Sequence, residues 1–344
     1  MRALSAYKKY AYYFYKYGSL NKLNNYLLNQ REYKSHVINM RSLPYKITVD
    51  PGNVCNLRCP GCHTGILHKE RIKPQFLTLE NYKIILKNFE QHALSIALYN
   101  WGEPFMNKEM FSIIDYTRSK KIGSTIHSNF NVFDKTMAEE SVKSGLTHIY
   151  LSIDGSTQEA YSQYRVKGNI DNVIDNIKIM VETRKRLKSH FPILTWKFLV
   201  FEHNKHEVED ARRMAKSLGL DSFEVFNAVP KLTDIYDLAE QNRNDLNFIP
   251  GQYDCRSLWS SIYVNPNGAV LPCSLAFRPE ESFGNLLENS LEEVWNNKNY
   301  TSARKMFVDP TYEDVPLPCK GCTYSIGKSC HKIINNKLPI KSQV

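Results

Sequence analysis

Six segments rich in β-branched and aromatic residues alternate with helical patterns, and this alternation most narrowly limits the fold. The predicted strands span residues 45–50, 95–99, 124–128, 148–153, 194–200 and 222–226. Between them, apolar residues recur at helical spacing, as in the segment that follows the predicted N-cap Thr78. Gly123, Gly145 and Gly219 each stand between a predicted helix and the next strand, where a left-handed residue can close the helix.

Repeated strand–helix units imply a parallel sheet with right-handed crossovers. Six units are fewer than the eight that close a TIM barrel. We therefore predict an α/β fold, an open six-unit (β/α)6 partial TIM barrel, followed by a small C-terminal α+β domain. Parallel sheets of this kind bind ligands at the carboxyl ends of their strands.

One short loop after the first predicted strand contains three cysteines, Cys55, Cys59 and Cys62. Three thiolates can bind three irons of a cubane cluster and leave the fourth iron open for a cofactor or substrate. A structural zinc site is the alternative, with His63 or His68 as the fourth ligand.

The C-x3-C-x2-C spacing of this loop resembles that of the radical S-adenosylmethionine (radical SAM) enzymes. The second predicted strand ends in Asn-Trp-Gly-Glu-Pro, which is similar to the Gly-Gly-Glu-Pro motif of that family, with Trp101 at the first glycine. The resemblance implies a [4Fe–4S] cluster held by the three loop cysteines, with S-adenosylmethionine (SAM) at its open iron. It also implies that SAM contacts Gly102, Glu103, Pro104, Ser128, Asn129, Ser152 and Arg165.

The chemistry of these residue types suits SAM. An acceptor-rich turn can bind its ammonium group, and the guanidinium of Arg165 can bind its carboxylate. Asp154 either caps the helix that follows or belongs to the site. The catalytic residues stay unassigned, with Lys197, Glu202 and His203 as candidates around the fifth strand. Lys197 lies inside that strand, where burial would lower its pKa.

A second group of cysteines lies in the C-terminal part of the chain: Cys255, Cys273, Cys319, Cys322 and Cys330. Residues 261–265 and 269–271 flank a Pro-Asn-Gly turn and predict a hairpin. The region resembles a SPASM or twitch domain, and its cysteine spacing is most similar to the deoxy-scyllo-inosamine dehydrogenase type. The resemblance implies one auxiliary [4Fe–4S] cluster on the first four cysteines, with Cys330 as a substitute ligand or an inert thiol. A zinc ribbon on the same four residues is the alternative.

The N-terminal residues carry most of the formal net charge of +10. Residues 1–46 contain nine Lys or Arg and one acid, interleaved with tyrosines. Such a segment could rest on an anionic membrane surface or on a partner. We favour a helix whose tyrosines pack on the barrel while its lysines face water. No nucleic-acid recognition motif accompanies the charge, so no nucleic-acid partner is expected.

The cysteines occur without an export signal, and no apolar stretch is long enough to span a membrane. We therefore expect a cytoplasmic protein, or one that is peripheral at the inner membrane surface. The predicted parts are a basic, aromatic-rich N-terminal extension (1–44), the radical SAM partial barrel (45–245), the auxiliary-cluster domain (246–332) and a basic tail (333–344).

The resemblance implies that a reduced cluster splits SAM and that the resulting deoxyadenosyl radical takes hydrogen from a small-molecule or peptide substrate. An auxiliary cluster with cysteine on every iron suits electron transfer. Our leading prediction is therefore a dehydrogenase-type oxidoreductase acting on a sugar- or cyclitol-like substrate, with a flavodoxin- or ferredoxin-type electron donor. A peptide-modifying SPASM maturase ranks lower, because residues 1–44 are short for a peptide-recognition domain. The third hypothesis is a zinc or Fe–S scaffold without enzymatic activity.

Overall fold

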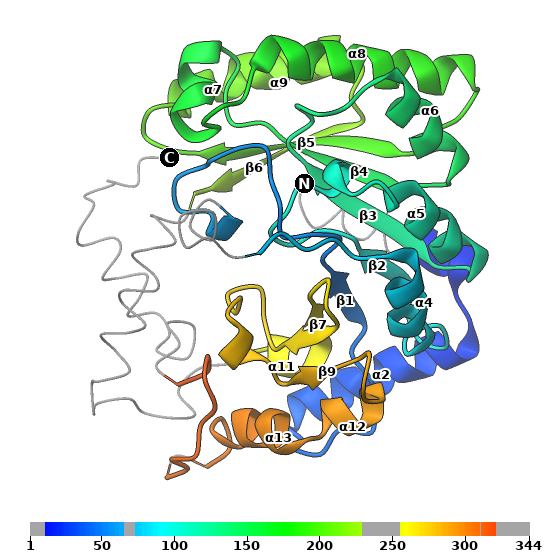
Figure 1. The fold of residues 1–344 in the computed structure, drawn as a ribbon, viewed down its shortest axis with the longest axis vertical. Coiled ribbons are helices and arrows are strands. Elements are labelled where there is room, and N and C mark those ends of the chain that lie inside the picture. Colours follow the sequence, from blue (N-terminus) through cyan, green and yellow to red (C-terminus); the bar gives the residue numbers. More distant parts are fainter. Residues whose placement is uncertain (1–10, 65–72, 229–254, 310, 321–344) are drawn as a thin grey trace.

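The computed structural model describes residues 11–64, 73–228, 255–309 and 311–320. Within them lies one sheet with the strand order β6-β5-β4-β3-β2-β1-β7-β8-β9 (Figure 1). The strands are β1 (Lys46–Val49), β2 (Ser95–Ala97), β3 (Gly123–Ser128), β4 (His148–Ser152), β5 (Ile193–Val200), β6 (Ser222–Asn227), β7 (Ser261–Val264), β8 (Ala269–Leu271) and β9 (Gly284–Asn285). Strands β1 to β6 are parallel neighbours in chain order, which confirms the six predicted β–α units.

Helices cover the outer side of these strands (Figure 1). They are α4 (Leu79–Lys87), α5 (Met110–Ser119), α6 (Lys135–Lys143), α7 (Gln158–Tyr164), α8 (Ile170–Arg186) and α9 (Val208–Ser217). Side chains alternate between the two faces of a strand. On β5, Trp196 and Phe198 are fully buried in the apolar core, whereas Lys197 between them lies on the opposite face. The register pairs Lys197 with Ser152, so these two residues share the inner face.

The predicted helix ends are mostly correct. Thr78 caps α4 by accepting a hydrogen bond from the Asn81 N–H, and Gly145 and Gly219 have φ angles of +79° and +78°. Gly123 does not close a helix. Lys121 takes the left-handed conformation instead, with φ of +56°, and Gly123 begins β3. A Cβ atom on Gly123 would lie 2.7 Å from the ring of Tyr13, so the glycine leaves room for the N-terminal segment.

The N-terminal segment packs on the protein wherever the structure describes it. Residues 11–17 are helical, and the buried hydroxyl of Tyr13 lies 3.0 Å from the hydroxyls of both Thr125 and Thr147. This agrees with the helix interpretation, with one correction, because Lys22 does not face water. Its ammonium group is buried and donates to the carbonyl oxygens of Tyr17 at 2.9 Å and Lys121 at 3.1 Å. Residues 1–10 lie outside the described part, and a membrane-surface contact stays a prediction. None of the described helices is long and apolar enough to cross a membrane.

The C-terminal region continues the sheet of the barrel. Strand β7 pairs in parallel with β1, and β8 and β9 follow as antiparallel neighbours. The predicted hairpin is present, and Gly268 in its turn has φ of +82°. Pairing with β7 satisfies the backbone groups that β1 would otherwise expose at the edge of an open sheet. The predicted small domain is therefore joined to the barrel by backbone hydrogen bonds.

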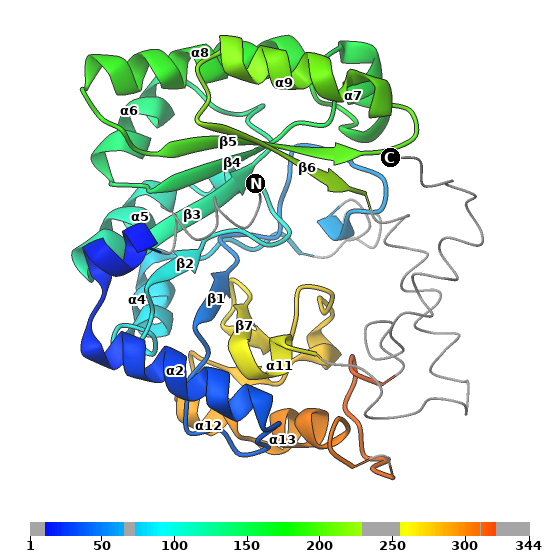
Figure 2. The ribbon, with the colours of Figure 1, turned by 180° about the vertical axis from the view of Figure 1, so that it is seen from behind.

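Helix α2 (Leu20–Lys34) lies beside α11 (Ser257–Ser260), with α12 (Leu291–Trp295) and α13 (Lys298–Lys305) close by (Figure 2). Two indole N–H groups of the C-terminal region donate to carbonyl oxygens of the N-terminal segment. Trp259 donates to Val37 at 2.9 Å, and Trp295 donates to Ser42 at 3.0 Å. The N-terminal segment therefore contacts both the start of β3 and the C-terminal region.

Candidate cofactor site

A cavity of about 470 Å³ lies at the carboxyl ends of the parallel strands. It is lined by all three loop cysteines and by most of the predicted cofactor contacts, namely Gly102, Glu103, Ser128, Asn129, Ser152 and Arg165. Lys197 of β5 lines it as well. Residues from six separate parts of the chain thus meet at the edge of the sheet where a parallel fold binds ligands.

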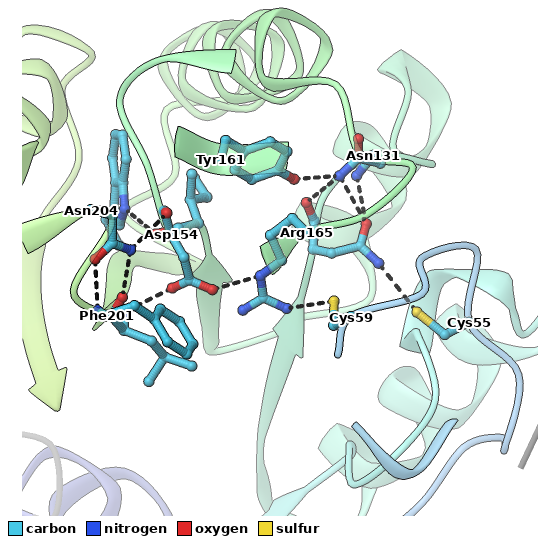
Figure 3. Close-up of polar contacts among 12 residues, drawn as sticks. Cys55, Cys59, Asn131, Asp154, Tyr161, Arg165, Phe201 and Asn204 are labelled. Carbon is cyan, nitrogen blue, oxygen red and sulfur yellow. Dashed lines mark hydrogen bonds and ion pairs between the residues drawn. The ribbon is translucent and has the colours of Figure 1, made fainter. Parts of the chain in front are cut away.

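Two of the three loop cysteines, Cys55 and Cys59, have polar neighbours that contact their sulfur atoms. The Sγ of Cys55 accepts from the Leu57 N–H at 3.4 Å and from the Asn129 amide at 3.6 Å. The guanidinium of Arg165 lies 3.8 Å from the Sγ of Cys59 (Figure 3). Burial, and then the charge of Glu103, raises the pKa of Cys55 to about 12. Burial disfavours the thiolate of Cys55, and a bound metal ion would favour it.

The donor set fits a cubane iron–sulfur cluster. No three Cys, His, Asp or Glu side chains of the described residues form a group that could hold a single metal ion. A cubane does not require such convergence, because its thiolates bind different irons. His63, considered as a zinc ligand, is buried and stacks on Phe277 with a ring-centroid distance of 3.9 Å. Burial and the nearby Arg278 lower the pKa of His63 to about 3. His68 lies outside the described residues.

The cysteine loop is joined to the Gly-Glu-Pro turn by close backbone contact. The Glu103 N–H donates to the Val54 carbonyl oxygen at 2.8 Å. A Cβ atom on Gly102 would overlap the Gly52 carbonyl oxygen, so only glycine permits this approach. Asp50 joins the same two segments, because its carboxylate accepts from the N–H groups of Trp101 at 3.1 Å and Gly52 at 3.3 Å. Burial raises the pKa of Asp50 to about 7.

Glu103 is a buried acceptor at the cavity wall. Its carboxylate accepts from the Ser128 hydroxyl at 2.7 Å and from the Asn129 N–H at 2.8 Å. Burial raises its pKa to about 7, which is partly opposed by these two hydrogen bonds. The arrangement suits a positively charged ligand group, because a nearby positive charge favours the ionised form of the carboxylate. Pro104 does not line the cavity; it is buried and begins the short 3-10 helix η1 (Pro104–Met106).

Asp154 positions Arg165. The fully buried Asp154 carboxylate accepts from the Arg165 Nε–H at 2.7 Å and from the Leu199 N–H at 2.7 Å (Figure 3). The N-cap of α7 is instead Thr157, whose side chain accepts from the Ala160 N–H. Asp154 therefore belongs to the site and does not cap the helix. With its Nε held, the guanidinium has its remaining N–H groups available toward the cavity and Cys59.

Side-chain amides form a hydrogen-bond network around Asn129, next to the cysteine loop. The Asn131 N–H donates to the Asn129 side-chain oxygen at 2.9 Å, and the Asn131 amide donates to the Tyr161 hydroxyl at 2.8 Å (Figure 3). The amide of Asn129 also donates to the side-chain oxygen of Asn56 at 2.9 Å. These bonds hold Asn129 between Cys55 and Glu103.

The candidate catalytic residues separate into one that lines the cavity and two that do not. Lys197 lines it, with its ammonium group 4.7 Å from the ring centre of Phe226, and burial lowers its pKa as predicted. The side chain of Glu202 is 78% exposed and pairs with Lys205 at the surface. His203 stacks on Phe201 with a ring-centroid distance of 5.3 Å, away from the cavity lining.

Sequence reasoning missed several cavity residues. Tyr99 and His127 line the wall and stack face to face with a centroid distance of 3.8 Å, and Tyr263 of β7 lines it from the C-terminal region. Its place next to Ser128, at the carboxyl end of β3, could have indicated His127. Tyr263 could not be found this way, because the pairing of β7 with β1 brings it to the cavity.

Three of the auxiliary cysteines lie in the described part, and Cys322 and Cys330 lie outside it. Burial raises the pKa of Tyr263, and the charges of Cys273 and Cys255 add to this. The charges of Cys273 and Cys319 likewise act on Tyr300, after the larger effect of burial. Cys273 therefore acts electrostatically on both tyrosines. Because Ser274 lines the cavity, the auxiliary region adjoins the cofactor site.

Comparisons with known proteins agree with this geometry. The model of the radical SAM superfamily matches residues 49–215, and that of the SPASM iron–sulfur cluster-binding domain matches residues 255–323. The antilisterial bacteriocin subtilosin biosynthesis protein AlbA of Bacillus subtilis is 24% identical over 282 residues, which cover 74% of this chain but only 60% of AlbA. The PqqA peptide cyclase of Gluconobacter oxydans is 22% identical over 315 residues, or 82% of this chain and 83% of the cyclase.

Among solved structures, Streptococcus suis SuiB bound to the precursor peptide SuiA has a TM-score of 0.61. It is 19% identical and covers 82% of this chain and 72% of SuiB, so it shows a shared fold. The cysteine loop, the acceptor-lined cavity and both family matches lead to one assignment. This chain belongs to the radical SAM superfamily and carries a SPASM domain, and its cofactors are a [4Fe–4S] cluster, SAM and auxiliary iron–sulfur.

Proposed function

We propose that this chain is a radical SAM enzyme that modifies a peptide. The proposal replaces the predicted oxidation of a sugar- or cyclitol-like substrate. AlbA is named for the biosynthesis of a bacteriocin, the second relative is a peptide cyclase, and SuiB was solved with a precursor peptide. These names favour peptide maturation, which the sequence alone ranked lower.

The observation that carries the enzymatic part is the single cavity shared by the three thiols and the acceptor wall. We assign Cys55, Cys59 and Cys62 as the ligands of the SAM-cleaving cluster. When bound, that cluster supplies the electron that splits SAM into methionine and a deoxyadenosyl radical. Glu103 binds the SAM ammonium group, because its carboxylate is held in place by Ser128 and Asn129.

Arg165 binds the carboxylate of SAM in this proposal. Its Nε–H is occupied by Asp154 at 2.7 Å, which fixes the plane of the guanidinium and directs its other donors. Ser152 and Asn129 supply hydrogen bonds to the rest of the cofactor. Besides Arg165, the residues that would hold SAM thus come from the cysteine loop, the Gly-Glu-Pro turn and the ends of β3 and β4, and all of them line one cavity.

Three side chains are available to contact the substrate. Tyr99, His127 and Lys197 line the same cavity on the strand side. The stacked rings of Tyr99 and His127 form an apolar wall, and Lys197 adds a positive charge whose pKa is lowered by burial. We assign Cys255, Cys273, Cys319 and Cys322 to one auxiliary cluster, with Cys330 as a substitute ligand. A flavodoxin- or ferredoxin-type protein is the proposed electron donor.

The first test is anaerobic reconstitution with iron and sulfide, followed by SAM and dithionite. We expect a brown protein that forms deoxyadenosine, and we expect Cys62→Ala to abolish this product. A colourless protein with stoichiometric zinc and no SAM cleavage would favour the scaffold hypothesis.

The second test uses a short peptide encoded next to the gene of this chain, with SAM cleavage already established. We expect a loss of two hydrogens, or deuterium uptake in heavy water, by mass spectrometry of the peptide. Lys197→Met should reduce peptide modification, whereas the exposed Glu202→Gln serves as the matched control and should not. An unchanged peptide together with oxidation of a cyclitol would restore the dehydrogenase hypothesis.

A further inference from the structure

Helix α2 turns polar side chains inward and leucines outward. Lys22, Asn29 and Glu32 are buried, whereas Leu20 is 77% exposed and Leu27 is 46% exposed. A helix that packs on a protein core usually has the opposite distribution, with its apolar residues inside. The outer face of α2 therefore presents apolar area that the described part of the chain leaves uncovered.

Hydrogen bonds fix this orientation of the helix. The ammonium group of Lys22 donates to two backbone carbonyl oxygens, and the amide of Asn29 donates to the Ser42 hydroxyl at 3.1 Å. The carboxylate of Glu32 accepts from the N–H groups of Arg41 at 3.0 Å and Ser42 at 2.9 Å. A rotation of α2 that buried its leucines would break all of these bonds. The exposure of the leucines is therefore built into the fold.

The exposed residues of α2 form one stripe along the helix, which we call the outer stripe: Leu20, Asn24, Leu27, Arg31 and Lys34. They follow one another at spacings of three or four residues, which places them on the same side of a helix. The two leucines lie in the first half of the stripe, and the two cations lie in the second half.

The charge around the outer stripe has one sign. Glu32 is the only acid among residues 11–46, and it is buried. The exposed residues of the same segment include five cations: Lys16, Arg31, Lys34, Arg41 and Lys46. Just before α2, Tyr15 is 91% exposed and adds a large aromatic side chain. A partner that covers this segment must therefore accept apolar and aromatic side chains and carry negative charge.

We propose that the outer stripe of α2 rests on an anionic lipid surface, with Leu20 and Leu27 at the boundary of the acyl chains and Arg31 and Lys34 among the headgroups. Leucines and an exposed tyrosine beside cations, without an exposed acid, suit this boundary. Two leucines bury little area, so the binding is reversible. The inference is independent of the substrate and of the proposed function.

The test is sedimentation of the full-length, reconstituted protein with lipid vesicles. We expect binding to vesicles that mix phosphatidylserine with phosphatidylcholine, at least tenfold weaker binding to pure phosphatidylcholine, and weaker binding at high salt. Leu20→Ser combined with Leu27→Ser should weaken binding to the anionic vesicles at least tenfold. Arg31→Gln combined with Lys34→Gln should weaken it roughly tenfold and reduce the preference for phosphatidylserine.

Two controls match these variants. Ile84→Ser removes an apolar side chain of α4 that is 46% exposed, as Leu27 is. Lys185→Gln combined with Lys216→Gln removes two exposed cations of α8 and α9, which lie at the opposite end of the molecule from α2 (Figures 1 and 2). Both controls should bind the anionic vesicles like the wild type. All altered side chains are exposed, so the thermal unfolding temperature should stay the same in every variant.

Three results would overturn the proposal. The first is a wild-type protein that does not bind the anionic vesicles or binds both kinds equally. The second is an equal loss of binding in the controls, which would show unspecific adsorption. The third is self-association that the double leucine variant abolishes, without vesicle binding, which would make the stripe a contact between two copies of this chain. A loss of deoxyadenosine formation would instead concern the proposed function, because the stripe variants should cleave SAM at the wild-type rate.

Discussion

Replacing Gly102 with alanine tests how closely the cofactor turn must approach the cysteine loop. The added Cβ would overlap the carbonyl oxygen of Gly52, and it would lie 2.7 Å from the Gly52 carbonyl carbon and 3.0 Å from the Val54 carbonyl oxygen. All three atoms belong to the backbone, so no side-chain rotation can relieve the overlap. Because carbon atoms normally pack about 3.5–4.0 Å apart, the two segments must separate by about 1 Å.

The cost can be worked out from these contacts. Overpacking of this kind costs about 1–3 kcal/mol, and backbone neighbours place Gly102→Ala near the upper value. Separation of the segments also breaks the hydrogen bond from the Glu103 N–H to the Val54 carbonyl oxygen, which is worth about 1 kcal/mol. A total of ~4 kcal/mol shifts the equilibrium between joined and separated segments by roughly a thousandfold.

The assay is SAM binding by calorimetry on reconstituted, unreduced protein, together with iron content and thermal unfolding. We expect Gly102→Ala to lose SAM binding and part of its iron. Gly219→Ala is the control, because its Cβ would contact only the Val181 side chain at 3.5 Å, far from the cavity. With φ of +78°, alanine at Gly219 costs ~1–2 kcal/mol of stability. It should leave SAM binding unchanged. Wild-type SAM affinity in Gly102→Ala would refute the argument that this contact assembles the site.

Two further predictions concern the charged groups of the cavity. Arg165→Met should weaken SAM binding roughly tenfold to a hundredfold. Asp154→Asn should weaken it less, and the double variant should equal Arg165→Met within ~0.5 kcal/mol in calorimetry; additive losses would show that Asp154 does not act through Arg165. Burial raises the pKa of Glu103 from 4.5 to about 7, so the folded state binds the proton more tightly than the unfolded state and stability falls as the pH rises through this range. We expect the free energy of unfolding to fall by ~3 kcal/mol between pH 5 and pH 8, measured by urea unfolding, and to fall less in Glu103→Gln. An equally large fall in Glu103→Gln would assign the effect to Asp50.

Local patterns along the chain were sufficient to find the strands and most of the predicted residues that line the cavity. Short runs of β-branched and aromatic residues placed all six parallel strands, because these residue types favour strands and such runs are visible in a sequence. The same reasoning failed for Glu202 and His203, which follow β5. Beyond the end of a strand, the alternation of side chains between two faces no longer predicts which side a residue faces. Glu202 lies at the surface, where it pairs with Lys205.

The role of Asp154 shows the limit of local reasoning most clearly. The residues around Asp154 in the sequence are compatible both with a helix-capping role and with a role in the site. Its partners, Arg165 and the Leu199 N–H, come from the next helix and from another strand. A contact between segments that are 11 and 45 residues apart in sequence leaves no local signal.

The chemistry of this protein was already determined by its sequence, because cysteine spacing and an acidic turn are local features that dictate which cofactor can bind. The tertiary structure decided which side chains share the cavity. It brought Tyr263 to the wall through the pairing of β7 with β1, and it placed Ser274 of the C-terminal region there as well. Those placements depend on contacts between distant segments, where packing and backbone pairing across the whole sheet override what any short stretch prefers.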